Sequence, residues 1–286
     1  MTAADKTAAG KTVLITGSTD GVGRRVAARL ARAGATVLIH GRDRARADRL
    51  LAEIHEAGGA ARFYPADFSS LDEVRAVAGN VTRDIGRLDI LINNAGIGVG
   101  RSASGRQISQ DGHELRFAVN YLSGFLLTRL LLPLLTASSA RIVNIASVGQ
   151  QPIDFSDVML SRGYSGQRAY CQSKLAQVMF TLDLADELSG TGGTATSLHP
   201  ATYMDTTMVR ADGITPMSTV DEGADAILHL AISPEMEGQS GLYLEGLRPS
   251  RANAQAYDPA ARARLRSLSL DLAGLQDTDP RSSPGA

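Results

Sequence analysis

Short apolar runs rich in β-branched residues alternate along the chain with longer segments in which apolar residues recur every three or four positions. The short runs predict strands and the longer segments predict amphipathic helices. The predicted strands cover residues 12–16, 36–40, 62–66, 88–93, 141–146, 194–198 and 241–245. The predicted helices cover residues 22–33, 71–84, 107–135, 167–188 and 221–232.

This regular alternation predicts the fold class. Strands that are apolar throughout are buried on both faces, and each crossover helix must bury its apolar stripe against the sheet. We therefore expect an α/β fold, a single-domain, doubly wound parallel sheet (Rossmann-like) of about seven strands with helices on both faces. The domain should occupy residues 11–250, after a flexible N-terminus at residues 1–10 and before a C-terminal helix and mobile tail at residues 251–286.

Two irregular segments, residues 149–166 and 201–219, each follow a predicted strand near its carboxyl end. Open α/β sheets bind ligands at that edge, so both segments are predicted to form the wall of a substrate site. We expect residues 201–219 to act as a mobile lid. Methionines in these segments suit an adaptable apolar pocket, although methionines also fill ordinary cores.

Composition narrows the class of partner. A formal net charge of -1 over 286 residues provides no basic field for nucleic acid or an anionic membrane, so a small-molecule partner is favoured. The N-terminus has no apolar signal segment, and no run of about 18 apolar residues occurs, so we expect a cytoplasmic protein without a membrane span. The longest apolar segment, residues 125–135, is expected to be a buried helix. No histidine spacing indicates a metal site.

A glycine-rich turn joins the first predicted strand to the first predicted helix. Backbone N–H groups and the helix dipole at such a junction can face a pyrophosphate. The spacing Gly-x-x-x-Gly-x-Gly differs from the Gly-x-Gly-x-x-Gly fingerprint, and a tight turn without a ligand is the alternative. The predicted cofactor contacts in this turn are Gly17, Ser18, Thr19, Gly21, Val22 and Gly23.

The end of the second predicted strand indicates which dinucleotide binds. An acidic residue there accepts hydrogen bonds from a free ribose 2′-hydroxyl, whereas an arginine accommodates a 2′-phosphate. Here Gly41 leaves no acidic side chain at the expected position, and Arg42 follows it. This arrangement favours NADP over NAD. The alternative is a surface Arg42 that is already paired with Asp43.

Tyr170 and Lys174 lie four residues apart in a predicted helix, so both side chains project from one face. A tyrosine is a poor acid–base catalyst at neutral pH unless a nearby cation stabilises its phenolate, and Lys174 supplies such a cation. The pair alone is nonspecific, because Tyr and Lys often share a helix surface. Together with Asn120 and Ser147 upstream, it indicates proton transfer beside a bound dinucleotide.

These motifs resemble the short-chain dehydrogenase/reductase family, in its order and on the expected elements, over about residues 11–246. The resemblance rests on the glycine turn, Asn93-Asn94-Ala95-Gly96, Asn120, Ser147 and Tyr170-Cys171-Gln172-Ser173-Lys174. The segment from Ala169 to Ala176 and the long interval before Tyr170 are similar to the retinol-dehydrogenase-like and light-dependent protochlorophyllide-reductase-like branch.

The resemblance implies a role for each member of the polar set. Tyr170 would donate a proton to a carbonyl oxygen as hydride arrives from the nicotinamide, and Ser147 would hold that oxygen. Lys174 would lower the pKa of the tyrosine and bind the nicotinamide ribose, and Asn120 would anchor a water that passes protons onward. The alternative makes Ser147 a strand-end cap and Asn120 a core amide.

Further cofactor contacts follow the third and fourth predicted strands. Asp67 either accepts a hydrogen bond from the adenine amino group or caps the next helix, and Phe68 is placed beside it in the same site. The resemblance places Asn93, Ala95 and Gly96 on the ribose side, and Asn94 either joins them or stabilises the sheet internally.

The segment after the sixth predicted strand departs from the family pattern. The family often has Pro-Gly there and a threonine five residues beyond the proline. In this chain Pro200 is followed by Ala201, and the fifth position is Asp205. Pro200 is kept as a cofactor contact, and Thr202 and Thr206 are the candidates for the contact to the nicotinamide carboxamide.

The leading prediction is an NADP(H)-dependent oxidoreductase that exchanges a hydride between the nicotinamide and a carbonyl or alcohol of a fairly apolar small molecule, such as a ketone, an aldehyde or a natural-product intermediate. A reductase of a carbon–carbon double bond is one alternative, although Ser147 favours a carbonyl. A noncatalytic NADP-binding regulatory protein is another, which the intact polar set disfavours. The resemblance also suggests a homodimer or homotetramer assembled through the helices at 107–135 and 167–188.

Overall fold

The computed structural model describes residues 8–100 and 105–276. Within these residues a mostly parallel sheet has the strand order β3-β2-β1-β4-β5-β6-β7-β8, and only β8 is antiparallel to its neighbour. The strands are β1 (Thr12–Ile15), β2 (Thr36–Gly41), β3 (Ala60–Pro65), β4 (Ile90–Asn93), β5 (Arg141–Ile145), β6 (Thr194–His199), β7 (Leu242–Glu245) and β8 (Arg248–Ser250). The helices are α1 (Gly21–Arg32), α2 (Arg44–Glu56), α3 (Leu71–Asp84), η2 (Phe117–Leu122), α4 (Ser123–Ala137), α5 (Gly166–Glu187), α6 (Thr207–Ala211), α7 (Val220–Ile232), η3 (Pro234–Met236), η4 (Ala254–Tyr257) and α8 (Pro259–Leu272).

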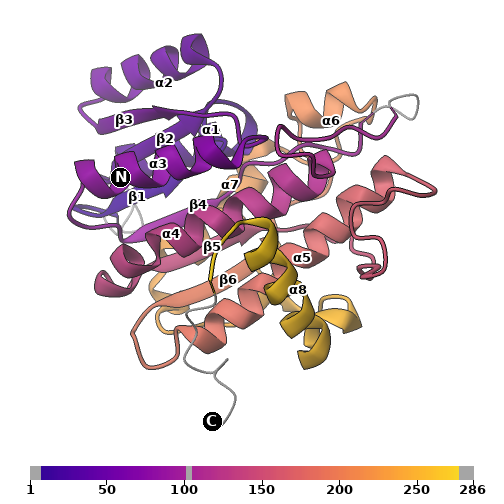
Figure 1. Ribbon diagram of the computed structural model, residues 1–286. Coiled ribbons are helices and arrows are strands. Elements are labelled where there is room, and N and C mark those ends of the chain that lie inside the picture. The colour runs from indigo at the N-terminus through magenta and orange to yellow at the C-terminus, as the bar shows by residue number, and fades with distance from the viewer. Residues whose placement is uncertain (1–7, 101–104, 277–286) are drawn as a thin grey trace.

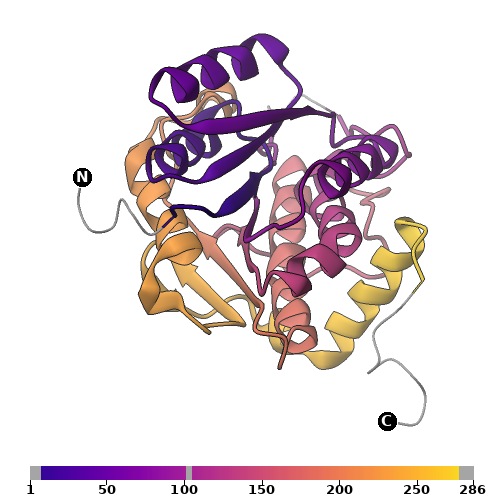
Figure 2. The ribbon, with the colours of Figure 1, turned by 90° about the vertical axis from the view of Figure 1, so that its left-hand side faces the viewer.

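Helices cover both faces of this sheet (Figures 1 and 2). One apolar cluster packs α3, α4, α5 and α8 on one face, and a second packs α1, α2 and α7 on the other. Successive residues of β1 point to opposite faces, so Leu14 joins the first cluster and Ile15 joins the second. The predicted α/β fold, with a doubly wound sheet and helices on both faces, is confirmed.

Several element assignments differ from the prediction. Helix α2 was not predicted from the sequence. Only Ala47, Leu50 and Ile54 of its thirteen residues are buried, so its apolar stripe is too short to give a clear helical pattern. The predicted helix at 107–135 begins later, because residues 108 and 114 form a β-bridge and the Glu114 carboxylate accepts a hydrogen bond from Phe117 N. Strand β8 extends the sheet beyond the seven predicted strands, and α6 lies within the segment expected to be irregular.

The C-terminal helix α8 packs on the outer side of α5. Leu265 and Leu270 are buried in the first apolar cluster, and Ser269 Oγ lies 2.7 Å from the buried Tyr121 hydroxyl. Arg262 lies 3.0 Å from Asp186 on α5. This helix therefore covers part of one of the two helices through which oligomers are expected, and the oligomeric state stays a prediction. Residues 1–7 and 277–286, which carry most of the expected flexible N-terminus and tail, lie outside the described residues.

One continuous helical segment, Phe117–Ala137, is long and apolar enough to cross a membrane by length and composition. Such a segment is weak evidence for a span, because the core helix of a soluble protein has the same properties. In this fold it packs against the sheet, and Leu126, Leu127 and Leu131 are fully buried. The apolar residues of this segment thus belong to the core, as expected for residues 125–135.

Candidate active site

The glycine turn connects β1 to α1 and is held by the end of β2. Gly17 N donates a hydrogen bond of 3.0 Å to His40 Nδ1, and Ser18 Oγ donates one of 2.8 Å to Ile15 O. Ser18 is fully buried, so its side chain braces the turn from inside. Gly17 and Gly21 have φ angles of 63° and 53°, which favour glycine. Backbone N–H groups are therefore presented at the start of α1.

Close packing explains why two of these positions are glycine. A Cβ on Gly17 would lie 2.8 Å from Ala95 Cα, and a Cβ on Gly23 would lie 2.5 Å from Gly17 O. Asn94 Nδ2 donates to Thr16 O at 2.8 Å and to Gly17 O at 3.0 Å. Two roles were considered for Asn94, a cofactor contact and internal stabilisation of the sheet. Its side chain stabilises the glycine turn internally.

His40 is a contributor that sequence reasoning missed. Its ring is buried, lies 3.8 Å from the Phe68 ring in a stacked arrangement, and its Nε2 lies 3.2 Å from Ala66 O. Burial lowers the pKa of His40 to about 4, so the ring is neutral at neutral pH. A neutral ring can accept from Gly17 N and donate to Ala66 O. Phe68 is itself buried in this stack, so only its backbone can face a ligand.

Arg42 and Asp67 lie together at the carboxyl ends of β2 and β3. The Arg42 guanidinium is 3.6 Å from the Asp67 carboxylate and its side chain is 68% exposed, so it is available to a ligand. Asp43 is not the partner of Arg42, because its carboxylate lies 3.3 Å from Arg46 and caps α2. Arg42 is still a surface arginine paired with an acid, as the alternative expected, but that acid is Asp67. The alternative cap role of Asp67 is wrong, since Ser70 caps α3. A second arginine, Arg46, lies 2.6 Å from Asp20 in the glycine turn and was not anticipated.

Ser147 and Tyr170 come together beside Gly149. A Cβ on Gly149 would lie 3.5 Å from Ser147 Oγ and 3.7 Å from Tyr170 Cε1, so the absent side chain leaves room next to both. Ser147 Oγ also accepts a hydrogen bond of 3.1 Å from Gly149 N, as the strand-end alternative anticipated. Burial raises the pKa of Tyr170, and the side chain of Ser147 gives the largest opposing effect.

Lys174 is buried one helical turn after Tyr170. Its amine donates to Ile145 O at 2.8 Å and to Gln177 Oε1 at 2.9 Å, and it lies 5.6 Å from the centre of the Tyr170 ring. Burial lowers the pKa of Lys174 to about 7. The amine is directed at two neutral acceptors, and burial raises the pKa of Tyr170. The lowering of the Tyr170 pKa by Lys174 stays a prediction.

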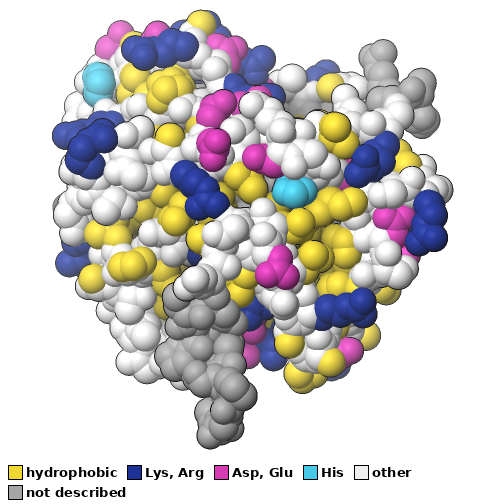
Figure 3. Space-filling model, viewed as in Figure 1, with side chains coloured by type: hydrophobic (Ala, Val, Ile, Leu, Met, Phe, Trp, Pro, Cys, Tyr) yellow, Lys and Arg dark blue, Asp and Glu magenta, His cyan; other side chains and the backbone are white. Residues whose placement is uncertain are grey.

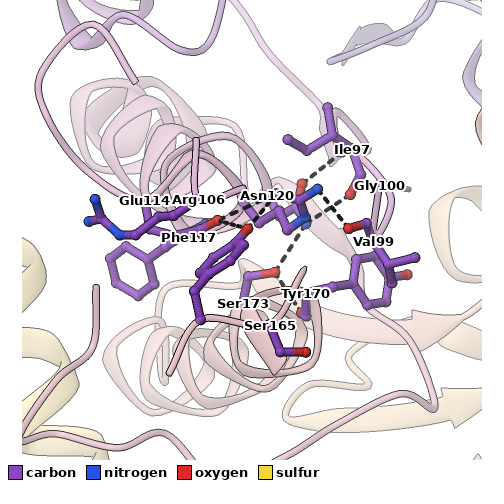
Figure 4. A network of polar contacts seen from close by, with 12 residues as sticks. Ile97, Val99, Gly100, Arg106, Glu114, Phe117, Asn120, Ser165, Tyr170 and Ser173 are labelled. Atoms are coloured by element: carbon purple, nitrogen blue, oxygen red, sulfur yellow. Dashed lines mark hydrogen bonds and ion pairs between the residues drawn. The ribbon is translucent and has the colours of Figure 1, made fainter. Parts of the chain in front are cut away.

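Asn120 lies in the π-helical segment η2 and links two walls of the site. Its Oδ1 accepts from Ile97 N at 2.7 Å, and its Nδ2 donates to Ser173 Oγ at 3.0 Å. Figure 4 shows Asn120 between Ile97, in the segment after β4, and Ser173 on α5. A Cβ on Gly96 would lie 3.4 Å from Asn120 Oδ1 and 3.7 Å from Lys174 Nζ. Asn120 thus has the bonds of a core amide, yet it lies beside Gly96, as Lys174 does.

The remaining predicted contacts are Asn93 at the end of β4 and the residues that follow β6. The prediction of Asn93 as a ribose contact is wrong, because its side chain is buried and its amide donates to Thr128 and Asn144 in the core. Thr202 is exposed, and its Oγ1 lies 3.0 Å from His199 Nε2. Thr206 caps α6, and its methyl group would lie 3.3 Å from a Cβ on Gly21. Of these two threonines, Thr206 is the one near the glycine turn, where the neighbouring Thr207 also forms a hydrogen bond with Asp20. The buried Pro200 precedes both candidates.

Comparison with known proteins agrees with this arrangement. The family model described as short chain dehydrogenase matches residues 11–215. The chain belongs to the short-chain dehydrogenase family. It is 33% identical to human retinol dehydrogenase 13, over 96% of this chain and 88% of that protein. It is 36% identical to human retinol dehydrogenase 14, over 93% of this chain and 87% of that protein. The predicted resemblance to the retinol-dehydrogenase-like branch is confirmed.

Solved structures show the same fold. A Mycobacterium paratuberculosis protein matches with a TM-score of 0.76 and 30% identity, over 94% of this chain and 95% of that chain. An Escherichia coli short chain dehydrogenase complexed with NADPH matches with a TM-score of 0.70 and 25% identity, over 85% and 98%. A Brucella melitensis 3-ketoacyl-(acyl-carrier-protein) reductase complexed with NADH matches with a TM-score of 0.68 and 28% identity, over 83% and 97%. Proteins with this fold are thus found with either nicotinamide cofactor.

Proposed function

We propose that this short-chain dehydrogenase is an NADP(H)-dependent oxidoreductase that interconverts a carbonyl and an alcohol in a fairly apolar small molecule. The observation that carries the proposal is the meeting of Ser147 and Tyr170 beside the open position at Gly149, with Lys174 one turn away. A carbonyl oxygen needs both a hydrogen-bond donor and a proton source when its carbon accepts a hydride. Ser147, just after β5, and Tyr170, on α5, supply these two functions.

The residues of the glycine turn fit a dinucleotide. Missing side chains at Gly17 and Gly23 bring the backbone close together, and the amino end of α1 follows directly. When bound, the cofactor supplies or accepts the hydride. We propose that the turn and Val22 hold the pyrophosphate, that Asp67 and the Phe68 backbone face the adenine, and that Ala95, Gly96 and Lys174 face the nicotinamide ribose. Pro200 and either Thr202 or Thr206 would hold the carboxamide.

Arg42 supports the choice of NADP over NAD. Its guanidinium is exposed at the end of β2, where a 2′-phosphate would lie, and its contact to Asp67 is a long, exposed ion pair that costs little to rearrange. Gly41 carries no acidic side chain, and a Cβ there would lie 2.5 Å from Thr19 Oγ1, so packing excludes an acid at this position. Thr19 therefore contributes to cofactor choice indirectly.

The surface and the rim of the site support an apolar small-molecule substrate. On the face of the molecule drawn in Figure 3, basic side chains are interspersed with acidic ones and form no large basic area of the kind that attracts nucleic acid. Tyr203, Met208 and Met217 are exposed apolar residues in the segment 201–219. The retinol dehydrogenases among its relatives are named for an apolar alcohol. We propose that the protein acts in the cytoplasm on ketones, aldehydes or their alcohols.

Titration of NADPH and NADH, followed by a carbonyl panel monitored by NADPH absorbance, tests this proposal. NADPH should bind more tightly, and Arg42→Ala should weaken NADPH binding by about tenfold while leaving NADH unchanged, since one charged hydrogen bond is lost. Arg44→Ala is the matched control, because Arg44 is an exposed neighbour paired with Asp48. Equal affinities would contradict the cofactor choice. NADPH binding without turnover of any carbonyl would favour a regulatory protein.

A further inference from the structure

The backbone of residues 98–100, which follow β4, is held from two sides by side chains of opposite charge. Arg116 donates from Nε to Gly98 O at 2.9 Å and from Nη2 to Val99 O at 2.7 Å. Asp212 accepts from Val99 N and from Gly100 N, each at 3.0 Å, through its two carboxylate oxygens. The carbonyls of this short segment thus face a cation and its N–H groups face an anion.

The Arg116 side of this arrangement is buried. Arg116 is 3% exposed, lies 3.5 Å from the equally buried Glu114, and donates to the Tyr164 hydroxyl at 2.8 Å. The Tyr164 hydroxyl donates in turn to Glu114 at 3.1 Å. Tyr164 belongs to the segment 149–166, so Arg116 joins that segment to residues 98–100. Separating this buried ion pair would leave buried charges without partners, which is costly. We therefore expect the segment 149–166 to stay bound to residues 98–100.

The Asp212 side is more accessible. Asp212 follows the short helix α6 in the segment 201–219 and is only partly buried. Gly98 makes room for it, since a Cβ at that position would overlap the Asp212 carboxylate. The segment that Asp212 holds continues directly from Ile97, whose N–H donates to Asn120 Oδ1 at 2.7 Å. Gly96, one residue earlier, lies beside both Asn120 and Lys174. The contact therefore lies next to the proposed active site.

We propose that Asp212 is a positioning residue that fastens the segment 201–219 to residues 98–100 and so completes the wall around the substrate. Through Arg116 the same residues are joined to 149–166, so three segments that are distant in the sequence enclose the site as one unit. The Asp212 contact is the one that opens for substrate entry, because its partners are two backbone N–H groups and it is only partly buried. Its kinetic consequence rests on the proposed function, whereas the contact itself does not.

Asp212→Asn tests the proposal in the full chain. Asparagine keeps the size of the side chain but replaces one acceptor oxygen by a donor, so one of the two N–H groups loses its partner. Hydrogen exchange of the ligand-free protein should accelerate roughly tenfold or more in peptides that contain Val99 and Gly100, the loss expected for one charged hydrogen bond. The KM of the substrate should rise about tenfold, with the NADPH dissociation constant unchanged and kcat altered by less than about threefold.

Asp205→Asn is the matched control. Asp205 lies in the same segment but pairs with the exposed Arg210, so this substitution should leave both exchange and KM unchanged. Unchanged exchange at Val99 and Gly100 in Asp212→Asn would overturn the proposal, as would faster exchange without a change in KM. A rise in KM accompanied by an equally large fall in kcat and a lowered Tm would also overturn the proposal, because these changes together indicate a merely structural role for Asp212. If no carbonyl is turned over, the exchange result still decides whether the contact exists.

Discussion

The nucleotide side and the substrate side of the site are built by different means. On the nucleotide side, missing side chains at Gly17 and Gly23 and the neutral His40 shape the turn. On the substrate side, loops are held in place by the buried charges of Arg116 and Glu114 and by the partly buried Asp212. The first side should therefore be sensitive to added atoms, and the second to removed charges.

The largest expected effect concerns the substrate side. Arg116→Met removes the guanidinium and leaves the Glu114 carboxylate buried without its cation. The free energy of unfolding should fall by about 3–5 kcal/mol, the usual cost of removing one partner of a buried ion pair. Urea denaturation measures this change. Arg44→Met, which breaks an exposed ion pair and a 5.9 Å contact of the guanidinium with the Phe63 ring, should cost less than about 1 kcal/mol. Similar values for the two variants would remove the distinction between the two sides.

An intermediate effect is expected on the nucleotide side. Gly23→Ala places a Cβ against Gly17 O and the Asn94 amide, so the turn must shift. We expect a loss of about 1–3 kcal/mol in unfolding free energy and at least a tenfold loss of NADPH affinity. Gly79→Ala is the matched control, because Gly79 is also helical and has nothing near its missing Cβ. That substitution should be neutral or stabilise by up to about 1 kcal/mol. A neutral Gly23→Ala would show that close packing does not shape the turn.

The smallest expected effect is the pH dependence that His40 contributes. Its pKa is about 4 in the folded protein and near 6.5 when unfolded, so the unfolded chain binds a proton first as the pH falls. The stability from neutral His40 is complete above pH 6.5 and is lost as the pH falls toward 4. Between pH 7.5 and 5.5 the loss should be about 1 kcal/mol. His40→Gln keeps an acceptor for Gly17 N but does not titrate, so its stability should vary less. Parallel pH profiles would contradict this.

The same contrast explains how much the sequence could predict. The glycine turn, Arg42 and the alternation of strands and helices follow from spacing and from apolar periodicity, which are local signals. The start of the helix at 107–135 could not be predicted, because it depends on the Glu114 hydrogen bond to Phe117 and on a bridge between residues 108 and 114. A long-range contact such as Asp212 with Val99 has no local signal, since 113 residues separate the partners.

Side-chain roles were harder to predict than positions. Asn93 lies in the expected motif, but β4 directs it toward Asn144 in the core rather than toward a ligand. His40 gave no signal because a histidine at a strand end is ambiguous until its partners are known. The direction of the Tyr170 pKa likewise depends on burial, which motif spacing does not contain.

The most direct measurement of the central claim is turnover of an accepted ketone by Tyr170→Phe, with NADPH affinity measured on the same sample. Phenylalanine keeps the ring but removes the transferable proton, so turnover should fall roughly 100-fold or more while the NADPH dissociation constant stays within about twofold. Tyr257→Phe, in η4, removes a hydroxyl that accepts a hydrogen bond of 3.0 Å from Ala252 N, and this variant should turn over the ketone at the wild-type rate. Retained turnover in Tyr170→Phe would contradict the assignment of Tyr170 as the acid and would place the proton source elsewhere.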